Sequence, residues 1–143
     1  IKAHSRAVAK EALRICDALE KAGVMLNRED IYHAAMLHDI ARLENRHPET
    51  GAKWLSELGY ESIAQIVRQH HDLESDKINE SSIFYVADKL VQEDRVVTLM
   101  QRFEKSREKC RCSEALLAHD RRMHLAFLIR DKINGLCQCD VIL

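Results

Sequence analysis

Long apolar runs are missing from this 143-residue sequence. No stretch approaches the ~20 apolar residues of a membrane-spanning helix, and no secretory signal with an apolar central region is present. Neither charge dominates, because 22 Lys and Arg residues stand against 23 Asp and Glu residues. The sequence therefore lacks the basic field that attracts nucleic acid. We expect a protein that binds neither a membrane nor nucleic acid in general.

A β-strand pattern, an internal repeat and a glycine-rich phosphate-binding loop are also missing. Apolar residues instead recur at spacings of three and four, which is typical of helices with one buried face. This spacing predicts helices over residues 5–21, 28–41, 48–58, 63–70, 81–91, 97–109 and 113–134. The polar and acidic residues 72–80 are expected to form an exposed loop. The predicted fold class is therefore all-α.

Four residues mark helix ends in the sequence. Asn27 precedes two acidic residues and is expected to cap the second helix. Pro48 suits the first turn of the third helix. Gly23 and Gly59 are expected to stop the first and third helices, because glycine readily adopts the left-handed conformation found after a helix end.

The length of the chain fits one domain. A chain of 143 residues can bury about two-thirds of the surface that it exposes when unfolded. We expect a single domain over residues 1–143, with a core from 1 to 95 and C-terminal helices from 97 to 143 that pack on this core. The sequence begins at Ile1 rather than at methionine, so we expect a fragment of a longer chain, in which an upstream domain can precede it. The oligomeric state stays open.

Five cysteines cannot all form disulfides within one chain, because their number is odd. Cys110 and Cys112 form one C-x-C pair and Cys137 and Cys139 form another, and four thiolates can hold a structural zinc ion. Structural zinc sites more typically use C-x-x-C, so this zinc site is the minor alternative. We expect reduced thiols and a cytoplasmic location.

The strongest chemical signal is the adjacent pair His38 and Asp39, at the end of an apolar stretch. Neighbouring side chains leave a helix about 100° apart, which lets both reach one ion. Imidazole and carboxylate together suit Fe, Mn, Co, Ni or Zn. An isolated His-Asp pair is more often an ordinary pair at a helix end, but this sequence contains further histidine and aspartate residues that could join it as ligands. The further candidate ligands are His4, His47, His70, His71 and Asp88.

Each candidate histidine also has a structural interpretation. His4 and His47 stand near the starts of predicted helices, where they can cap the backbone or remain exposed. His70 and His71 end a predicted helix, where the helix dipole favours a protonated histidine. His33 lies five residues before His38, so it faces elsewhere and is not counted as a ligand.

Asp88 needs a partner because it lies inside a strongly apolar predicted helix. Burying an unpaired carboxylate costs several kcal/mol. A metal ion can be that partner, and Lys89 or Arg95 is the alternative.

The order of these residues resembles the ligand set of the HD-domain metal-dependent phosphohydrolase superfamily, in its members with two metal ions. That order is His4, His38-Asp39, His47, His70 and Asp88. Three local stretches strengthen the resemblance over residues 4 to about 95. They are LHDIAR at 37–42, similar to the family's LHDIAK; HPETGA at 47–52, similar to HA..GA; and VADKL at 86–90, similar to ADKL or ADKI.

The resemblance implies an HD-domain helical bundle with a metal site at its centre. His4, His38, Asp39 and Asp88 would then hold one divalent transition-metal ion. Asp39 would bridge to a second ion, which His47 and His70 complete. The family segment that resembles residues 66–70 has its ligand at the place of His70, and His71 is the alternative. Simpler members of the family bind one ion.

The implied activity is hydrolysis of a phosphoester or phosphoanhydride by a metal-bound hydroxide. The substrate would be a nucleotide or another phosphorylated small molecule. Asp39 and Arg42 are the candidate catalytic residues. Arg42 follows His38 by one helical turn and can bind phosphate oxygens bidentately, although the family commonly has lysine there. Lys89 and Arg95 are weaker candidates for this role.

Two other functions share the same ligand pattern. HD-fold diiron oxygenases carry these six ligands, although no feature of this sequence marks their substrate pocket. A metal-binding regulatory domain attached to an upstream nucleotidyltransferase is the other alternative.

Overall fold

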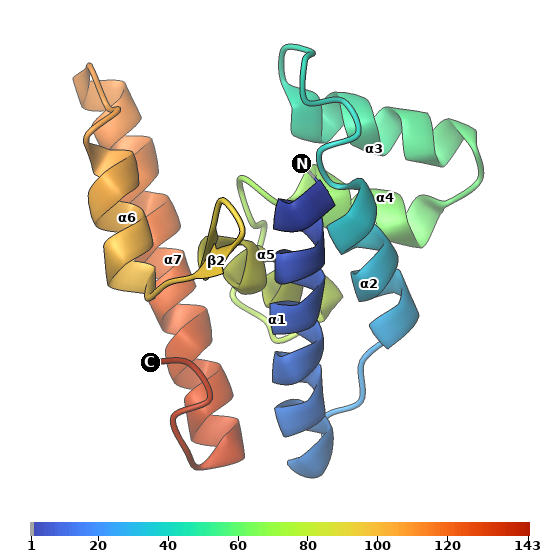
Figure 1. Ribbon diagram of the computed structural model, residues 1–143, viewed down its shortest axis with the longest axis vertical. Coiled ribbons are helices and arrows are strands. Elements are labelled where there is room, and N and C mark those ends of the chain that lie inside the picture. Colours follow the sequence, from blue (N-terminus) through green and yellow to red (C-terminus); the bar gives the residue numbers. More distant parts are fainter. Residues whose placement is uncertain (1) are drawn as a thin grey trace.

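The structure is a computed structural model that describes residues 2–143. These residues form seven α-helices and one two-stranded antiparallel hairpin, arranged as in Figure 1. The elements are α1 (Lys2–Lys21), α2 (Arg28–Leu37), α3 (His47–Glu57), α4 (Glu61–Arg68), α5 (Glu80–Lys89), β1 (Val91–Gln92), β2 (Arg95–Val96), α6 (Leu99–Arg107) and α7 (Ser113–Cys137). The predicted all-α class is confirmed. The short hairpin was not expected from the sequence.

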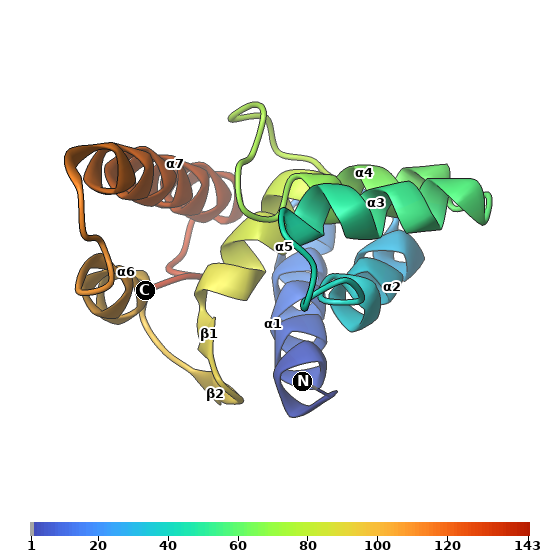
Figure 2. The ribbon, with the colours of Figure 1, turned by 90° about the horizontal axis from the view of Figure 1, so that it is seen from above.

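Helix α5 is the centre of the molecule. All residues from Ser81 to Leu90 are buried, so this helix contacts other elements on every side. Figure 2 shows α5 between two groups of helices, with α1 to α4 on one side and the side-by-side pair α6 and α7 on the other. The Tyr85 hydroxyl of α5 donates a hydrogen bond of 2.8 Å to the Arg122 carbonyl of α7. Apolar burial and this bond together join the two groups.

The predicted helix ends occur as expected. Asn27 accepts a hydrogen bond from the backbone N–H of Asp30 at 3.1 Å and thereby caps α2. Pro48 lies in the first turn of α3. Gly23 and Gly59 have φ values of +89° and +90°, which glycine adopts without steric strain.

Helix α2 ends at Leu37, so the prediction of a helix through residue 41 was wrong. The Nδ1–H of His38 donates a hydrogen bond of 2.8 Å to the Ala35 carbonyl. In a continuing helix that carbonyl would accept from the backbone N–H of Asp39. The His38 side chain thus competes for the last helical acceptor, and the chain continues in tight turns. Ile40, an apolar residue of the predicted helix 28–41, is 45 % exposed in this turn.

The cysteine pairs lie at opposite ends of α7, so the zinc alternative was wrong. Cys110 and Cys112 precede α7, while Cys137 ends it and Cys139 follows. A helix of 25 residues is about 37 Å long, which one ion cannot span.

Beyond α7 the chain turns back, and the backbone N–H of Ile142 donates to the Asn134 side chain at 3.0 Å.

None of the helices within residues 2–143 is both long enough and apolar enough to cross a bilayer.

We expect Tyr85→Phe to lower the free energy of unfolding by about 1 kcal/mol, because it removes the hydroxyl that joins α5 to α7 and little else. Thermal unfolding followed by circular dichroism measures this change. Tyr60→Phe is the matched control, since Tyr60 is 53 % exposed. Equal melting temperatures for the two variants would contradict the role of this bond.

Candidate metal centre

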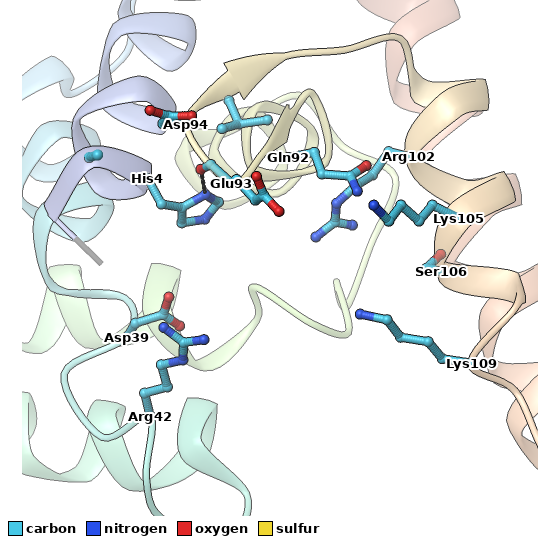
Figure 3. Close-up of a pocket in the computed structure, with 12 residues that line it drawn as sticks. His4, Asp39, Arg42, Gln92, Glu93, Asp94, Arg102, Lys105, Ser106 and Lys109 are labelled. Carbon is cyan, nitrogen blue, oxygen red and sulfur yellow. Dashed lines mark hydrogen bonds between the residues drawn. The ribbon is translucent and has the colours of Figure 1, made fainter.

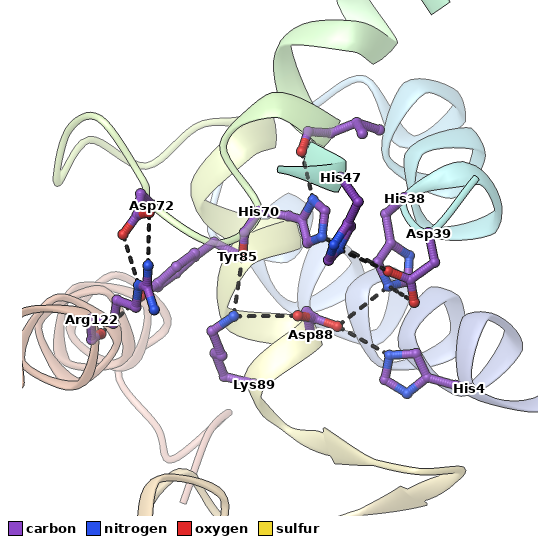
Figure 4. Close-up of polar contacts among 11 residues, drawn as sticks. His4, His38, Asp39, His47, His70, Asp72, Tyr85, Asp88, Lys89 and Arg122 are labelled. Carbon is purple, nitrogen blue, oxygen red and sulfur yellow. Dashed lines mark hydrogen bonds and ion pairs between the residues drawn. The ribbon is translucent and has the colours of Figure 1, made fainter. Parts of the chain in front are cut away.

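The residues predicted as ligands come together where α1 to α4 pack against the central helix α5 (Figure 4). Asp88 belongs to the central helix α5. The others belong to the first turn of α1 (His4), the turn after α2 (His38 and Asp39), the first residue of α3 (His47) and the turn after α4 (His70). Segments that are far apart in the sequence thus meet at a single polar cluster.

The first group of possible metal ligands is His4, His38 and Asp88, whose ligand atoms lie within 4.8 Å of one another. Asp88 Oδ1 is 3.2 Å from His4 Nε2 and 3.6 Å from His38 Nε2. Two imidazole nitrogens and one carboxylate oxygen therefore face a common point.

The second group is His47, His70 and His71, and their ligand atoms also lie within 4.8 Å of one another. The sequence left His70 and His71 as alternatives, whereas both take part in this group. The His71 ring packs against both neighbours, with centroid separations of 4.6 Å to His47 and 4.4 Å to His70.

Asp39 lies between the two groups. Its Oδ2 is 3.3 Å from His38 Nε2 in the first group. Its Oδ1 is 3.4 Å from His47 Nε2 and 4.0 Å from His70 Nε2 in the second. One carboxylate thus turns a different oxygen toward each group, an arrangement suited to bridging two ions.

Backbone carbonyls fix the orientation of three of the rings. The Nδ1 atoms of His4, His38 and His70 lie 2.7, 2.8 and 2.6 Å from carbonyl oxygens. A carbonyl only accepts, so Nδ1 carries a proton in each of these rings. Each Nε2 is thereby turned toward the carboxylates, and it is the atom that would bind a metal ion once it is deprotonated.

Two ring nitrogens have no hydrogen-bond partner in the part of the chain that the structure describes. They are the buried Nε2 atoms of His47 and His70. An unsatisfied buried polar atom is rare and destabilising, so it needs an explanation. A bound cation would accept both lone pairs, and the donor set of this group therefore fits a metal ion.

Burial sets the charge of the second group. It lowers the pKa of His70 to about 3 and that of His71 to about 4, and the neighbouring positive groups act in the same direction. Both rings are therefore neutral at pH 7, as a metal ligand must be. In the first group, the hydrogen bond to Asp88 raises the pKa of His4.

Lys89 is the protein partner of Asp88. Its Nζ lies 3.3 Å from Asp88 Oδ2 and donates to the His70 carbonyl at 3.2 Å. Burial would raise the pKa of Asp88, but Lys89 and His4 together hold it well below its usual range. Asp88 thus stays ionised, with Oδ2 on Lys89 and Oδ1 free for the first group. Arg95, the other partner considered, is exposed on β2.

A cavity of about 600 Å³ lies beside the cluster (Figure 3). His4, Asp39 and Arg42 line one wall, and residues of the hairpin and of α6 line the rest. Arg42 belongs to the turn after α2, so its predicted place on a helical face was wrong, although it does line the cavity beside Asp39. His33 is exposed and lies outside both groups, as expected.

The sequence did not predict that α6 forms a wall of this cavity. Its basic residues recur at helical spacing, but the sequence showed no sign of the hairpin that turns α6 toward the cluster.

A family model described as HD domain matches residues 1–92, which is more than half of the chain. The chain belongs to the HD-domain family. Members of this family are mostly metal-dependent phosphohydrolases, and HD domains bind divalent metals. The family match ends at residue 92, so it includes β1 but neither α6 nor α7. No curated protein and no solved structure matched the chain.

We expect manganese to stabilise this HD domain, because an ion that binds only the folded state raises the free energy of unfolding. The gain is about 2.7 kcal/mol at a free concentration of 100 times Kd. Thermal unfolding with and without Mn²⁺ measures the shift in melting temperature. His38→Ala should abolish most of the shift, because it removes a possible ligand atom of the first group.

His33→Ala is the matched control and should retain the full shift, since this histidine is exposed and outside the cluster. A shift that survives in His38→Ala and disappears in His33→Ala would show that the ion binds elsewhere.

Proposed function

We propose that this chain is a metal-dependent phosphohydrolase that cleaves a phosphoester or phosphoanhydride of a nucleotide-like or other phosphorylated small molecule. The observation that carries the proposal is the position of Asp39, which turns one oxygen to each of two groups of possible ligands. Membership of a family of mostly metal-dependent phosphohydrolases supports it further.

Two divalent transition-metal ions are the cofactor in this proposal. His4, His38 and Asp88 would hold the first ion together with Asp39 Oδ2. His47 and His70 would hold the second together with Asp39 Oδ1. Imidazole nitrogens and carboxylate oxygens suit Fe, Mn, Co, Ni or Zn.

We infer that His70 is the ligand of the second ion and that His71 supports it. The carbonyl of Val67 fixes the His70 ring, and the buried Nε2 of that ring is without a partner in residues 2–143. His71 packs edge-on against both His47 and His70, so it restricts the positions of their rings.

When bound, such ions lower the pKa of a water molecule to near neutrality and offset the charge of the phosphoryl oxygens. The chain itself holds the reacting groups in place. Asp39 and Asp88 supply fixed negative charge, and Lys89 keeps Asp88 ionised. Arg42, beside Asp39 on the cavity wall, binds phosphate oxygens and orients the phosphoryl group.

A phosphate-release assay tests the proposed function, on protein purified without chelator and a panel of nucleotides, dinucleoside polyphosphates and p-nitrophenyl phosphate. We expect release from at least one compound, with a loss of more than about 100-fold in Asp39→Ala, since even residues that only orient metal ligands contribute 10–100-fold. Asp131→Ala, on the exposed side of α7, is the control and should keep full activity.

Oxygen uptake by protein that holds iron, with no phosphate release from any compound, would favour the diiron oxygenase instead. Release that persists unchanged in Asp39→Ala would show that the reaction does not use this cluster.

We expect Arg42→Ala to lower kcat/KM about 10–100-fold with unchanged metal content, because a hydrogen bond from a charged group to phosphate is lost. Arg42→Lys should keep most of the activity, since it retains the charge. Arg46→Ala removes an 81 % exposed arginine side chain from the same turn and should have little effect. Steady-state kinetics and elemental analysis check these outcomes. If Arg42→Ala lost metal as well as activity, its role would be structural.

A further inference from the structure

The cavity beside the metal centre has one strongly basic wall. Arg102, Lys105 and Lys109 line it, together with Ser106, and all come from α6 or the turn that follows it. Within residues 2–143 the ion pairs involve other arginines and lysines, so none of these three cations has a carboxylate within 4.0 Å. We call Arg102, Lys105 and Lys109 the α6 basic row.

The fold holds this row in place. Leu99 and Phe103 bury an adjacent side of α6 in the core. Thr98 caps the helix start, where its hydroxyl accepts from the backbone N–H of Gln101 at 3.1 Å. The Nε2–H of the buried His119 of α7 donates to the Phe103 carbonyl at 2.9 Å. These contacts fix the position of α6, and they do not involve the three basic side chains themselves.

The α6 basic row lies across the cavity from the metal centre. Figure 3 shows Arg102, Lys105 and Lys109 on one side and His4, Asp39 and Arg42 on the other. The acidic residues of the cavity are Asp39, on the wall of the metal centre, and Glu93 and Asp94, at the tip of the hairpin. In Figure 3 the Glu93 carboxylate lies between His4 and Arg102. Positive charge is therefore concentrated on the α6 wall.

Neighbouring like charges without counter-ions repel one another, so an anion bound among them is favoured. A substrate with a single phosphoryl group would occupy the metal wall and Arg42 alone, and the α6 basic row would face solvent. A substrate with further negative charge on the far side of the cavity would contact both walls.

We propose that the α6 basic row binds the additional phosphate groups of a phosphoanhydride chain while one terminal phosphoryl group occupies the metal centre. The substrate class is therefore a polyphosphate or a nucleotide with at least three linked phosphates. This inference rests on the proposed function, because it takes the metal centre as the place of hydrolysis. The row lies beyond residue 92, outside the HD-domain match.

The reaction in this proposal is simple hydrolysis of the chain. A water oxygen bonds to the terminal phosphorus, and the bridging P–O bond breaks. Its electron pair passes to the leaving oxygen of the shortened chain, and a proton of the water goes to solvent. The α6 basic row is placed to offset the negative charge that the shortened chain gains.

Calorimetric titration of the full chain as purified tests the binding step. The probes are imidotriphosphate, whose P–N–P bridges resist hydrolysis, and inorganic orthophosphate. We expect imidotriphosphate to bind more tightly than orthophosphate, and Lys105→Ala/Lys109→Ala to weaken its binding about tenfold through the loss of two exposed charge pairs. Metal content measured before and after titration shows whether the probe has removed metal.

Lys10→Ala/Lys53→Ala is the matched control, because it removes the same charge from exposed positions that do not line the cavity. Unchanged binding in this control supports the α6 basic row. Equal weakening in both double variants, or none in either, would overturn it.

Kinetics separates this inference from the proposed function. We expect Lys105→Ala/Lys109→Ala to lower kcat/KM for tripolyphosphate about tenfold and to leave that for p-nitrophenyl phosphate unchanged. Hydrolysis of p-nitrophenyl phosphate that needs Asp39, with no effect of the double variant on either substrate, would overturn the inference alone. Absence of hydrolysis of every compound would overturn both.

Discussion

Burial of a carboxylate in the central helix is the constraint on which the rest of the site depends. Asp88 is 5 % exposed within α5, a helix whose side chains are buried from Ser81 to its end. An unpaired charge there would be strongly destabilising, so neighbouring elements must supply partners. Lys89 satisfies one oxygen, and two histidines approach the other. The packing of α1 and α2 against α5 therefore brings the first group of possible ligands together.

The second constraint is the early end of α2. His38 bonds to the Ala35 carbonyl, and this bond both orients the ring and ends the helix. Asp39 is thereby released into a turn, where its two oxygens face the two ligand groups. The same local competition for a carbonyl thus coincides with the end of α2 and with the turn that holds Asp39.

Much of the fold was predictable because short-range signals dominate it. The caps at Asn27 and Gly59 are local, and the order of histidines and aspartates identified the cluster before any geometry was known. The end of α2 was not predictable, because it depends on a side chain that replaces a backbone donor. Neither was the α6 wall, because a hairpin of two residues per strand leaves no periodic pattern. The distance between the cysteine pairs likewise required the position of α7.

Anomalous diffraction at the manganese edge, from crystals grown with Mn²⁺, tests the central claim most directly. The account predicts two peaks about 3.5–4 Å apart on either side of Asp39, one among His4, His38 and Asp88 and one beside His47 and His70. A single peak in the first group would reduce the site to one ion. Peaks only at other positions, or none at all, would contradict the interpretation of this cluster as a metal centre.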